Sequence, residues 1–344
     1  MQEWDKELFV ELHETLTILP PLCGIPKGLD KYFKDGKLYQ PVIRRKNYIT
    51  NEWSHFNIAR AERPIAKMDL KMEQKECMFC PENEDKTPRH VKTNGDYIRI
   101  PNDTNWKVRV FPNLFPWMIE HMNIVETAKH KISLAELNLE EEILALTTAQ
   151  EIVKELEKNN VYPILFRNQG WGASISHYHW QIGALPYLPN RLKEELNIAS
   201  EFYKKYNTNI FDAIIVSEQE QSVRVIADTE KILVLSPFAP RTAFEVWLIF
   251  KTKVTSLSQL TKDEICLLSE QLYTVLKKLY NKIQIDTLNI IFHQIPSYDI
   301  EIQNLYRLHI EIMPHKFLAG AEKGFLEFAI EITPEHAAEL LKQP

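Results

Sequence analysis

The sequence predicts an α+β protein built from two copies of one structural unit. The segment Ser133-Leu134-x-x-Leu137-Asn138-x-x-Glu141 recurs at an offset of 123 residues (256 − 133) as Ser256-Leu257-x-x-Leu260-Thr261-x-x-Glu264. Each copy follows a strand region with a proline-bearing turn, and each precedes a strand that carries histidine. A strand–helix–strand series that repeats at one offset indicates a duplicated unit.

Each repeated segment reads as the start of a helix. Asn138 and Glu141 stand three residues apart, as in a capping box, and residues 143–156 place apolar side chains at helical spacing. Residues 162–166 and 244–250 are rich in apolar and β-branched side chains and predict strands, and a further helix is predicted near residues 192–206.

Length and composition narrow the class of protein. A chain of 344 residues suits one large domain or two units of about 150–170 residues. Forty-four per cent hydrophobic and 26% charged residues are ordinary for a soluble protein, and a net charge of −6 gives no general argument for nucleic-acid binding. No apolar run approaches the ~20 residues of a membrane span, and the polar start is unlike a secretory signal. Four cysteines do not make a disulfide framework, so a cytoplasmic location is expected.

Residues 1–40 are predicted to be an N-terminal extension without chemistry of its own. Residues 8–12 could begin a helix, which Pro20 and Pro21 would end. The two units then follow as a first half over residues 41–190 and a second half over residues 191–344.

The candidate active site is the sequence His177-x-His179-x-Gln181. In an extended strand the side-chain period is two, so the three polar side chains would share one face. A glycine-bearing loop, residues 166–172, precedes them and could let backbone approach a ligand. A His-x-His pair by itself is also compatible with a structural strand.

This segment resembles the active-site strand of galactose-1-phosphate uridylyltransferases, a family of the histidine-triad superfamily. The resemblance implies antiparallel sheets flanked by helices and a nucleophilic His179 that is transiently nucleotidylated. Gln181 stands where the hydrolases of the superfamily carry a third histidine, which favours transfer over hydrolysis. Gln181 and Ser174 would donate hydrogen bonds to the α-phosphoryl oxygens, and Asn168 would contact the nucleotide. Glu311 stands at the nucleophile's place in the second half, so only the first half should catalyse covalent transfer.

Two further segments resemble the family's binding motifs. The series Thr50-Asn51-Glu52-Trp53 reads as a turn between two strands and is followed by Arg60-Ala61-Glu62-Arg63-Pro64. The resemblance implies that Arg60 and Arg63 bind substrate phosphate, for which the guanidinium fork is well suited. Phe111-Pro112-Asn113-Leu114-Phe115 is similar to the nucleoside-binding segment, which assigns nucleoside contacts to Asn113 and Phe115. Leu114 occupies a position that is often polar in uridylyltransferases, so the identity of the nucleotide base stays open.

Cys77-x-x-Cys80 by itself is compatible with a redox pair, a metal site or chance. Zinc takes four sulfur or nitrogen ligands in a tetrahedron. The zinc-bearing branch of the resembled family combines such a pair with a distant histidine and the first histidine of His-x-His. The resemblance therefore implies a structural zinc ion at Cys77, Cys80, His130 and His177.

The second half carries two more resemblances. Lys316, Phe317 and Glu322 belong to a segment similar to the one that holds the hexose, often across the interface of a homodimer. Thr333-Pro334 matches the start of the closing helix. A second metal, Zn2+ or Fe2+, is implied at the family's other site, with an ordinary hydrogen-bonded polar cluster as the alternative; its residues here are Glu195, His293, His309 and Glu311.

The sequence thus predicts an enzyme that acts on a nucleotide sugar and a sugar 1-phosphate. The first hypothesis is a UDP-glucose–hexose-1-phosphate uridylyltransferase of galactose metabolism. The alternative inside the superfamily is a phosphorylase of ADP-glucose or of a dinucleotide. From other classes, a zinc-stabilised protein that binds nucleotides without turnover and a redox role for the cysteine pair stay open.

Overall fold

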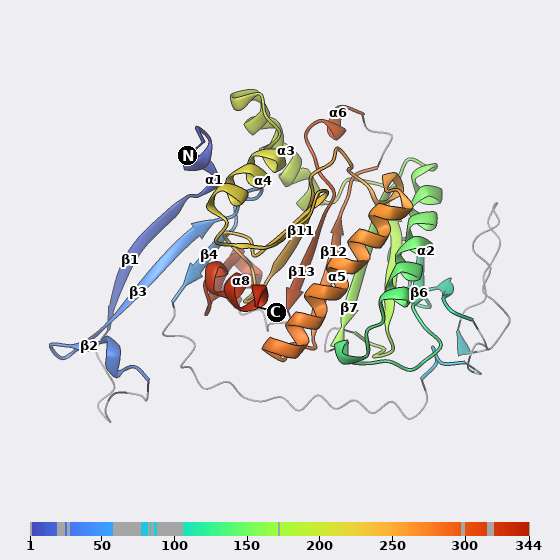
Figure 1. Ribbon diagram of the computed structural model, residues 1–344, viewed down its shortest axis with the longest axis horizontal. Coiled ribbons are helices and arrows are strands. Elements are labelled where there is room, and N and C mark those ends of the chain that lie inside the picture. Colours follow the sequence, from blue (N-terminus) through green and yellow to red (C-terminus); the bar gives the residue numbers. More distant parts are fainter. Residues whose placement is uncertain are drawn as a thin grey trace.

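The computed structural model describes residues 2–18, 25, 28–57, 77–81, 83, 86–87, 106–170, 173–296, 300–314 and 320–343. Its strands form two sheets (Figure 1). The larger sheet has nine strands in the order β5-β6-β8-β7-β12-β13-β11-β10-β9, and every neighbouring pair is antiparallel. Its strands are β5 (Arg109–Pro112), β6 (Ile119–Val125), β7 (Tyr162–Gln169), β8 (His179–Leu185), β9 (Val225–Asp228), β10 (Ile232–Leu235), β11 (Val246–Phe250), β12 (Leu288–His293) and β13 (His309–Pro314).

The smaller sheet contains the N-terminal strands and one strand from near the C-terminus. Its strands are β1 (Glu11–Ile18), β2 (Phe33–Lys34), β3 (Lys37–Lys46), β4 (Trp53–Phe56) and β14 (Glu327–Ile330). β14 runs parallel to β4, and β1 and β3 extend away from the nine-stranded sheet (Figure 1). The strand–turn–strand predicted around Thr50 is present as β3 and β4.

The helix predicted from Leu8 onward is wrong. Helix α1 (Asp5–Leu8) has a single turn, and β1 begins three residues after it. β1 pairs with β3 through eight residues, from Glu11 opposite Arg45 to Ile18 opposite Leu38. This ladder satisfies the backbone groups of the segment, and local helix propensity does not outweigh it.

The two repeated segments adopt the same local structure. Short 3-10 helices η4 (Leu134–Glu136) and η6 (Leu257–Gln259) begin with capping boxes at Ser133 and Ser256. The long helices α2 (Leu139–Glu157) and α5 (Lys262–Ile283) then begin at the caps Asn138 and Thr261. This duplication confirms the predicted α+β architecture of repeated units.

Helices α2 and α5 pack side by side on one face of the nine-stranded sheet (Figure 1). Their apolar stripes and the facing strands form the main core. Its fully buried members include Leu146, Val153, Leu165, Trp180, Ile182, Leu248, Leu272 and Ile310.

The opposite face of the sheet differs between the halves. In the second half, α3 (Asn190–Tyr206) and α4 (Ile210–Gln221) cover it and bury Trp247 and Ile249 of β11. In the first half, Phe79 packs with Phe111 and Val125, and its ring lies against that of His179. The halves join where β7 pairs with β12, with Asn168 opposite Asn289.

The other helices of the described ranges are short. They are η1 (Asp30–Tyr32), α6 (Ile300–Gln303), α7 (Gly320–Phe325) and α8 (Pro334–Lys342), which starts with proline as predicted. Within the described ranges, none of the helices combines the length and apolar character needed to cross a membrane.

Candidate active site

His179 and Gln181 lie on β8 in the centre of the first half. Residues two apart on a strand share a face, and the intervening Trp180 is fully buried in the core beneath α2 and α5. His177 departs from the prediction that it shares this face, because the strand begins only at His179 and His177 lies in a bend before it. The bend turns its ring toward Cys77 and Cys80.

The ring of His179 has a defined tautomer. Its Nδ1 lies 2.8 Å from the backbone oxygen of His177. A carbonyl oxygen only accepts, so Nδ1 carries the hydrogen and Nε2 keeps its lone pair. Burial lowers the pKa of His179 to about 4, which keeps the ring neutral at neutral pH. The arrangement leaves the ring neutral, with its lone pair on Nε2.

Three predicted amide side chains lie on or beside strands of the same sheet, and each contacts a polar side chain from another strand. Gln181 Oε1 lies 3.0 Å from His121 Nε2 on β6. Asn168 Oδ1 accepts from Asn289 Nδ2 on β12 at 2.6 Å. Asn113, just after β5, donates from Nδ2 to Asn123 Oδ1 on β6 at 3.2 Å. The sheet therefore gathers Asn113, Asn168 and Gln181, which the sequence predicted to act together.

His121, Asn123 and Asn289 were not predicted. His121 and Asn123 stand two residues apart on β6, and Asn123 is directly opposite Gln181. The same period-two pattern that identified β8 is present on β6. It could have been recognised only with knowledge that β6 pairs with β8.

The other predicted residues of the first half lie in turns around the sheet. Phe115 follows β5, and 81% of its surface is exposed, which leaves its ring accessible to a ligand. Ser174 lies exposed in the loop that leads into β8.

Gly170, at the start of this loop, has a φ of +69°, and a Cβ there would lie 2.5 Å from Thr287 Cγ2. This glycine is therefore required for packing against residues 286–287, and the predicted approach of a ligand to the loop stays a prediction.

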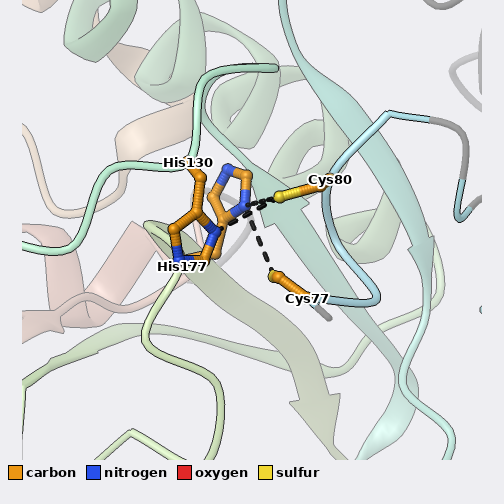
Figure 2. A group of neighbouring side chains, drawn as sticks. All are labelled: Cys77, Cys80, His130 and His177. Atoms are coloured by element: carbon orange, nitrogen blue, oxygen red, sulfur yellow. Dashed lines mark hydrogen bonds between the residues drawn. The ribbon is translucent and has the colours of Figure 1, made fainter. Parts of the chain in front are cut away.

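The four predicted zinc ligands lie together (Figure 2). Their ligand atoms are all within 4.8 Å of one another. Cys77 Sγ and Cys80 Sγ each lie 3.6 Å from His177 Nδ1, and Cys80 Sγ lies 3.2 Å from His130 Nδ1. Tetrahedral zinc bonds of about 2.3 Å to sulfur and about 2.0 Å to nitrogen put such atoms roughly 3.5 Å apart. The residues therefore fit a zinc ion with four protein ligands.

The surroundings of His177 support this orientation. Its Nε2 lies 2.8 Å from the carbonyl oxygen of Thr127, so Nε2 carries the hydrogen and Nδ1 faces the sulfurs. The Thr127 hydroxyl in turn donates to Glu141 of α2 at 3.0 Å. Glu141 is thereby used for this contact and for an ion pair with Lys131, in place of the predicted reciprocal bond to Asn138.

Known proteins are similar to this chain in sequence and fold. A galactose-1-phosphate uridylyltransferase of Thermotoga maritima is 26% identical over 326 residues, which cover 87% of this chain and 97% of the relative. An ADP-glucose phosphorylase of Arabidopsis thaliana is 24% identical over 334 residues, covering 87% and 92%. The uridylyltransferase of Haemophilus influenzae is 26% identical over 342 residues, covering 89% and 96%.

Solved structures of such proteins are also similar to this chain. A solved uridylyltransferase matches with a TM-score of 0.66 at 26% identity, covering 88% of this chain and 97% of that one. The crystal structure of the Arabidopsis thaliana ADP-glucose phosphorylase with bound ADP-glucose matches the fold with a TM-score of 0.75 at 24% identity, covering 88% and 98%. Residues 209–323 also match the family described as scavenger mRNA decapping enzyme C-terminal binding.

Along most of its length, the chain is thus similar to galactose-1-phosphate uridylyltransferases.

The residues of the second predicted metal group also lie together. The candidate ligand atoms of Glu195, His293, His309 and Glu311 lie within 4.8 Å of one another. His293 lies between the carboxylates, with Nδ1 3.0 Å from Glu195 and Nε2 2.9 Å from Glu311. Burial opposes a charge on His293, but the two carboxylates outweigh it and raise the pKa of His293 to about 9.

Two arginines that the sequence analysis did not identify complete this group. Arg241 forms an ion pair with Glu311 and lies 3.1 Å from Glu245. Arg191 Nε lies 3.0 Å from Glu195, and its Nη1 pairs with Glu52. The buried carboxylates thus already have cationic partners, so a divalent ion would have to displace an arginine. As arranged, the residues fit the alternative of a polar cluster better than a metal site.

The remaining predicted site residues lie elsewhere. Arg60, Arg63, Lys316 and Phe317 fall outside the described residues. Glu322 on α7 is buried, and its Oε1 lies 3.3 Å from the backbone nitrogen of Ala329 on β14. The structure therefore places Glu322 against the smaller sheet, and its contact with a hexose stays a prediction.

Proposed function

We propose that this chain is a nucleotidyltransferase that acts through a covalent nucleotidyl-histidine at His179. One observation carries the proposal. The hydrogen bond from Nδ1 to the His177 carbonyl leaves Nε2 with its lone pair, on a face that also carries Gln181. A neutral imidazole held in one tautomer is prepared for nucleophilic attack.

The proposed reaction has two displacements. His179 Nε2 attacks the α-phosphorus of a nucleotide sugar, the bond between that phosphorus and the sugar 1-phosphate oxygen breaks, and sugar 1-phosphate leaves. Positive charge that develops on the ring is stabilised by the His177 carbonyl, which accepts from Nδ1–H. A second phosphorylated acceptor then attacks the nucleotidyl-histidine and restores the neutral ring. Both leaving groups need little protonation, so the main requirement is stabilisation of charge on the phosphoryl oxygens.

The surrounding residues are assigned by the family resemblance and by their position. Gln181 and Ser174 would donate to the α-phosphoryl oxygens, and Asn168 would contact the nucleotide. Asn113 and the exposed ring of Phe115 would bind the nucleoside. For the residues outside the described ranges, Arg60 and Arg63 would bind phosphate, and Lys316 and Phe317 would bind the hexose. Glu322 would also bind the hexose.

The cysteine–histidine group would hold a structural zinc ion through Cys77, Cys80, His130 and His177. Four protein ligands leave no position for substrate, so the ion would stabilise the bend at His177 and take no part in the transfer. A cytoplasmic location, where both cysteines stay reduced, is consistent with this role. The resemblance also implies a homodimer, which light scattering of the purified protein tests.

UDP-glucose and a hexose 1-phosphate are the first substrates to consider, because curated relatives of this length are galactose-1-phosphate uridylyltransferases. A phosphorylase of ADP-glucose or a dinucleotide is the second candidate. It is supported by the similarity to the ADP-glucose phosphorylase along the chain. Leu114, which is exposed and apolar where uridylyltransferases are often polar, keeps the identity of the base open between the two candidates.

Intact-mass measurement tests the proposal. The protein is incubated with UDP-glucose or ADP-glucose without an acceptor. A uridylyl or adenylyl increment is expected on the parent and on His336→Gly, a control at an exposed histidine of α8. The increment should be absent from His179→Gly. Phosphate as sole acceptor then separates the candidates, since a phosphorylase would release nucleoside diphosphate. A parent that takes up no nucleotide from either donor would leave a protein that binds nucleotides without turnover.

A further inference from the structure

The side-chain amide of Gln181 is oriented by a residue from the neighbouring strand. His121 on β6 is 4% exposed, and its Nε2 lies 3.0 Å from Gln181 Oε1 across 60 residues of sequence. An amide oxygen only accepts hydrogen bonds, so His121 Nε2 is the donor. The Gln181 Nε2 group then lies on the opposite side of the amide, away from His121.

The direction of this amide matters because its two ends have opposite polarity. Phosphoryl oxygens require hydrogen-bond donors, and an amide oxygen turned toward them would repel them. The two ends are similar in size, so packing alone does not choose between them. A donor on the protein side makes that choice, because it selects the oxygen and leaves the NH2 group for the ligand.

His121 has the properties of a dedicated donor. Burial lowers the pKa of His121, so the ring is neutral and carries one N–H. Its Nδ1 is buried and makes no hydrogen bond to any part of the chain that the structure describes. Within that part, the ring's one polar contact is therefore with Gln181. The Trp117 ring lies 5.9 Å away at an angle of 71° and packs against it.

The side-chain amide of Asn168 is oriented in the same way, by a donor that engages its oxygen. Asn289 Nδ2 donates to Asn168 Oδ1 at 2.6 Å, and the two residues are directly opposite each other on β12 and β7. Gln181 and Asn168 thus have their side-chain oxygens engaged by donors of a neighbouring strand, which leaves their NH2 groups for an anion. Asn113 differs, because its NH2 group donates to Asn123.

We propose that His121 is a positioning residue for phosphoryl transfer, which turns the Gln181 NH2 group toward the phosphoryl oxygens by donating to its carbonyl. The assignment rests on the proposed function of His179. Its ligand is the charged α-phosphoryl group in the transition state, so His121 acts on the rate of transfer through Gln181 and does not itself touch substrate.

Four variants test the assignment, with the rate of nucleotide uptake measured by intact mass from whichever of UDP-glucose and ADP-glucose labels the parent. His121→Phe keeps an aromatic ring without a donor, and we expect the rate to fall roughly tenfold to a hundredfold, less than the ~10²–10³ of a lost oxyanion donor. His121→Gln can place an N–H near the position of Nε2 and should stay within a few-fold of the parent. His121→Asn is equally polar but too short, so it should behave as His121→Phe. The loss should lie in kcat, with KM nearly unchanged.

The decisive comparison is a double-mutant cycle with Gln181→Met. If His121 acts only through Gln181, His121→Phe should cost nothing further once Gln181 is replaced. A double variant slower than Gln181→Met by the full factor of His121→Phe would overturn the assignment. Equal rates for the parent and a folded His121→Phe, or for His121→Gln and His121→Asn, would also overturn it while leaving the proposed function intact. A parent that no donor labels would overturn both.

Discussion

The ring of Phe79 lies edge-on against the ring of His179, with the ring centroids 5.1 Å apart and the planes at 85°. Phe79 stands between Cys77 and Cys80 in the sequence. The cysteine loop therefore supplies two of the four candidate metal ligands and also a packing contact to the proposed nucleophile. A change at the metal group should reach His179 through Phe79 and through the bend at His177.

We expect the parent protein to contain one zinc ion per chain and Cys77→Ser to lose it. Without the ion, the loop that carries Phe79 and the bend at His177 lose their common link. The melting temperature should fall by at least roughly 5 °C, and nucleotide uptake should fall with it. Elemental analysis and thermal unfolding measure the two effects. Cys266→Ser is the matched control, because this half-buried cysteine lies on α5. A fully active, metal-free parent would contradict the zinc proposal.

A buried carboxyl beneath the active-site strand should make stability depend on pH. Glu142 of α2 is 1% exposed and lies 3.4 Å from Arg167 Nη1, which Glu126 approaches to 2.8 Å. Burial, and then the charge of Glu126, raise the pKa of Glu142 from 4.5 to about 8. The folded protein therefore favours the protonated form, and this contribution to stability is full below pH 4.5 and lost as the pH rises to about 8.

Glu142→Gln should remove this dependence, because the amide cannot ionise. Urea unfolding at pH 5, 6, 7, 8 and 9 measures the free energy of unfolding of both proteins. Between pH 5 and 8 the parent should lose stability relative to the variant, by at most about 1.4 kcal/mol per pH unit. Glu140→Gln, at an exposed position in the first turn of the same helix, should follow the parent. Parallel curves for the parent and Glu142→Gln would contradict the assignment.

Arg241 should be required for the stability of the polar cluster in the second half. It pairs with the buried carboxylates of Glu245 and Glu311. Arg241→Met leaves both without this partner, and breaking such a buried pair costs about 3–5 kcal/mol. The double variant Arg241→Met/Glu311→Gln should recover part of the loss, because it also removes one of the unpaired charges.

The same cluster makes a prediction about metal content. With both arginines in place, we expect the parent to bind no second ion, and Arg241→Met should leave the zinc content of the cysteine group unchanged. Native mass spectrometry counts the ions. A second divalent ion on the parent, lost in Glu195→Gln, would show that the cluster is a metal site after all.

Gly170 and Gly36 form a matched pair for testing the loop before β8. Both have positive φ, +69° and +75°, but a Cβ at Gly170 would lie 2.5 Å from Thr287 Cγ2 and one at Gly36 would meet nothing within 4 Å. Gly36→Ala should cost about 1 kcal/mol from backbone strain alone. Gly170→Ala adds the collision and should cost about 2–4 kcal/mol. Equal costs in urea unfolding would mean that the loop moves away from Thr287 without penalty.

Much of the site was contained in the sequence because its parts are local. His179 and Gln181 stand two residues apart and share a face through the period of a strand. Cys77 and Cys80 stand three apart in one loop. The repeated helix starts at Ser133 and Ser256 specify the same caps in both halves, because capping depends on residues within one turn. Such short spacings can be read without knowing the fold.

The tertiary structure decided which distant residues meet. The contact of His121 with Gln181 exists because β6 pairs with β8, and that of Asn289 with Asn168 because β12 pairs with β7. Residues 11–18 form a strand because β3 lies beside them, and Arg191 and Arg241 reach the second cluster from separate elements. Strand pairing and buried charge compensation act between segments far apart in the chain, so no local pattern specifies them. The sequence by itself predicted the proposed nucleophile, the candidate zinc ligands and the duplicated fold, whereas the partners that orient and neutralise those side chains were set by packing.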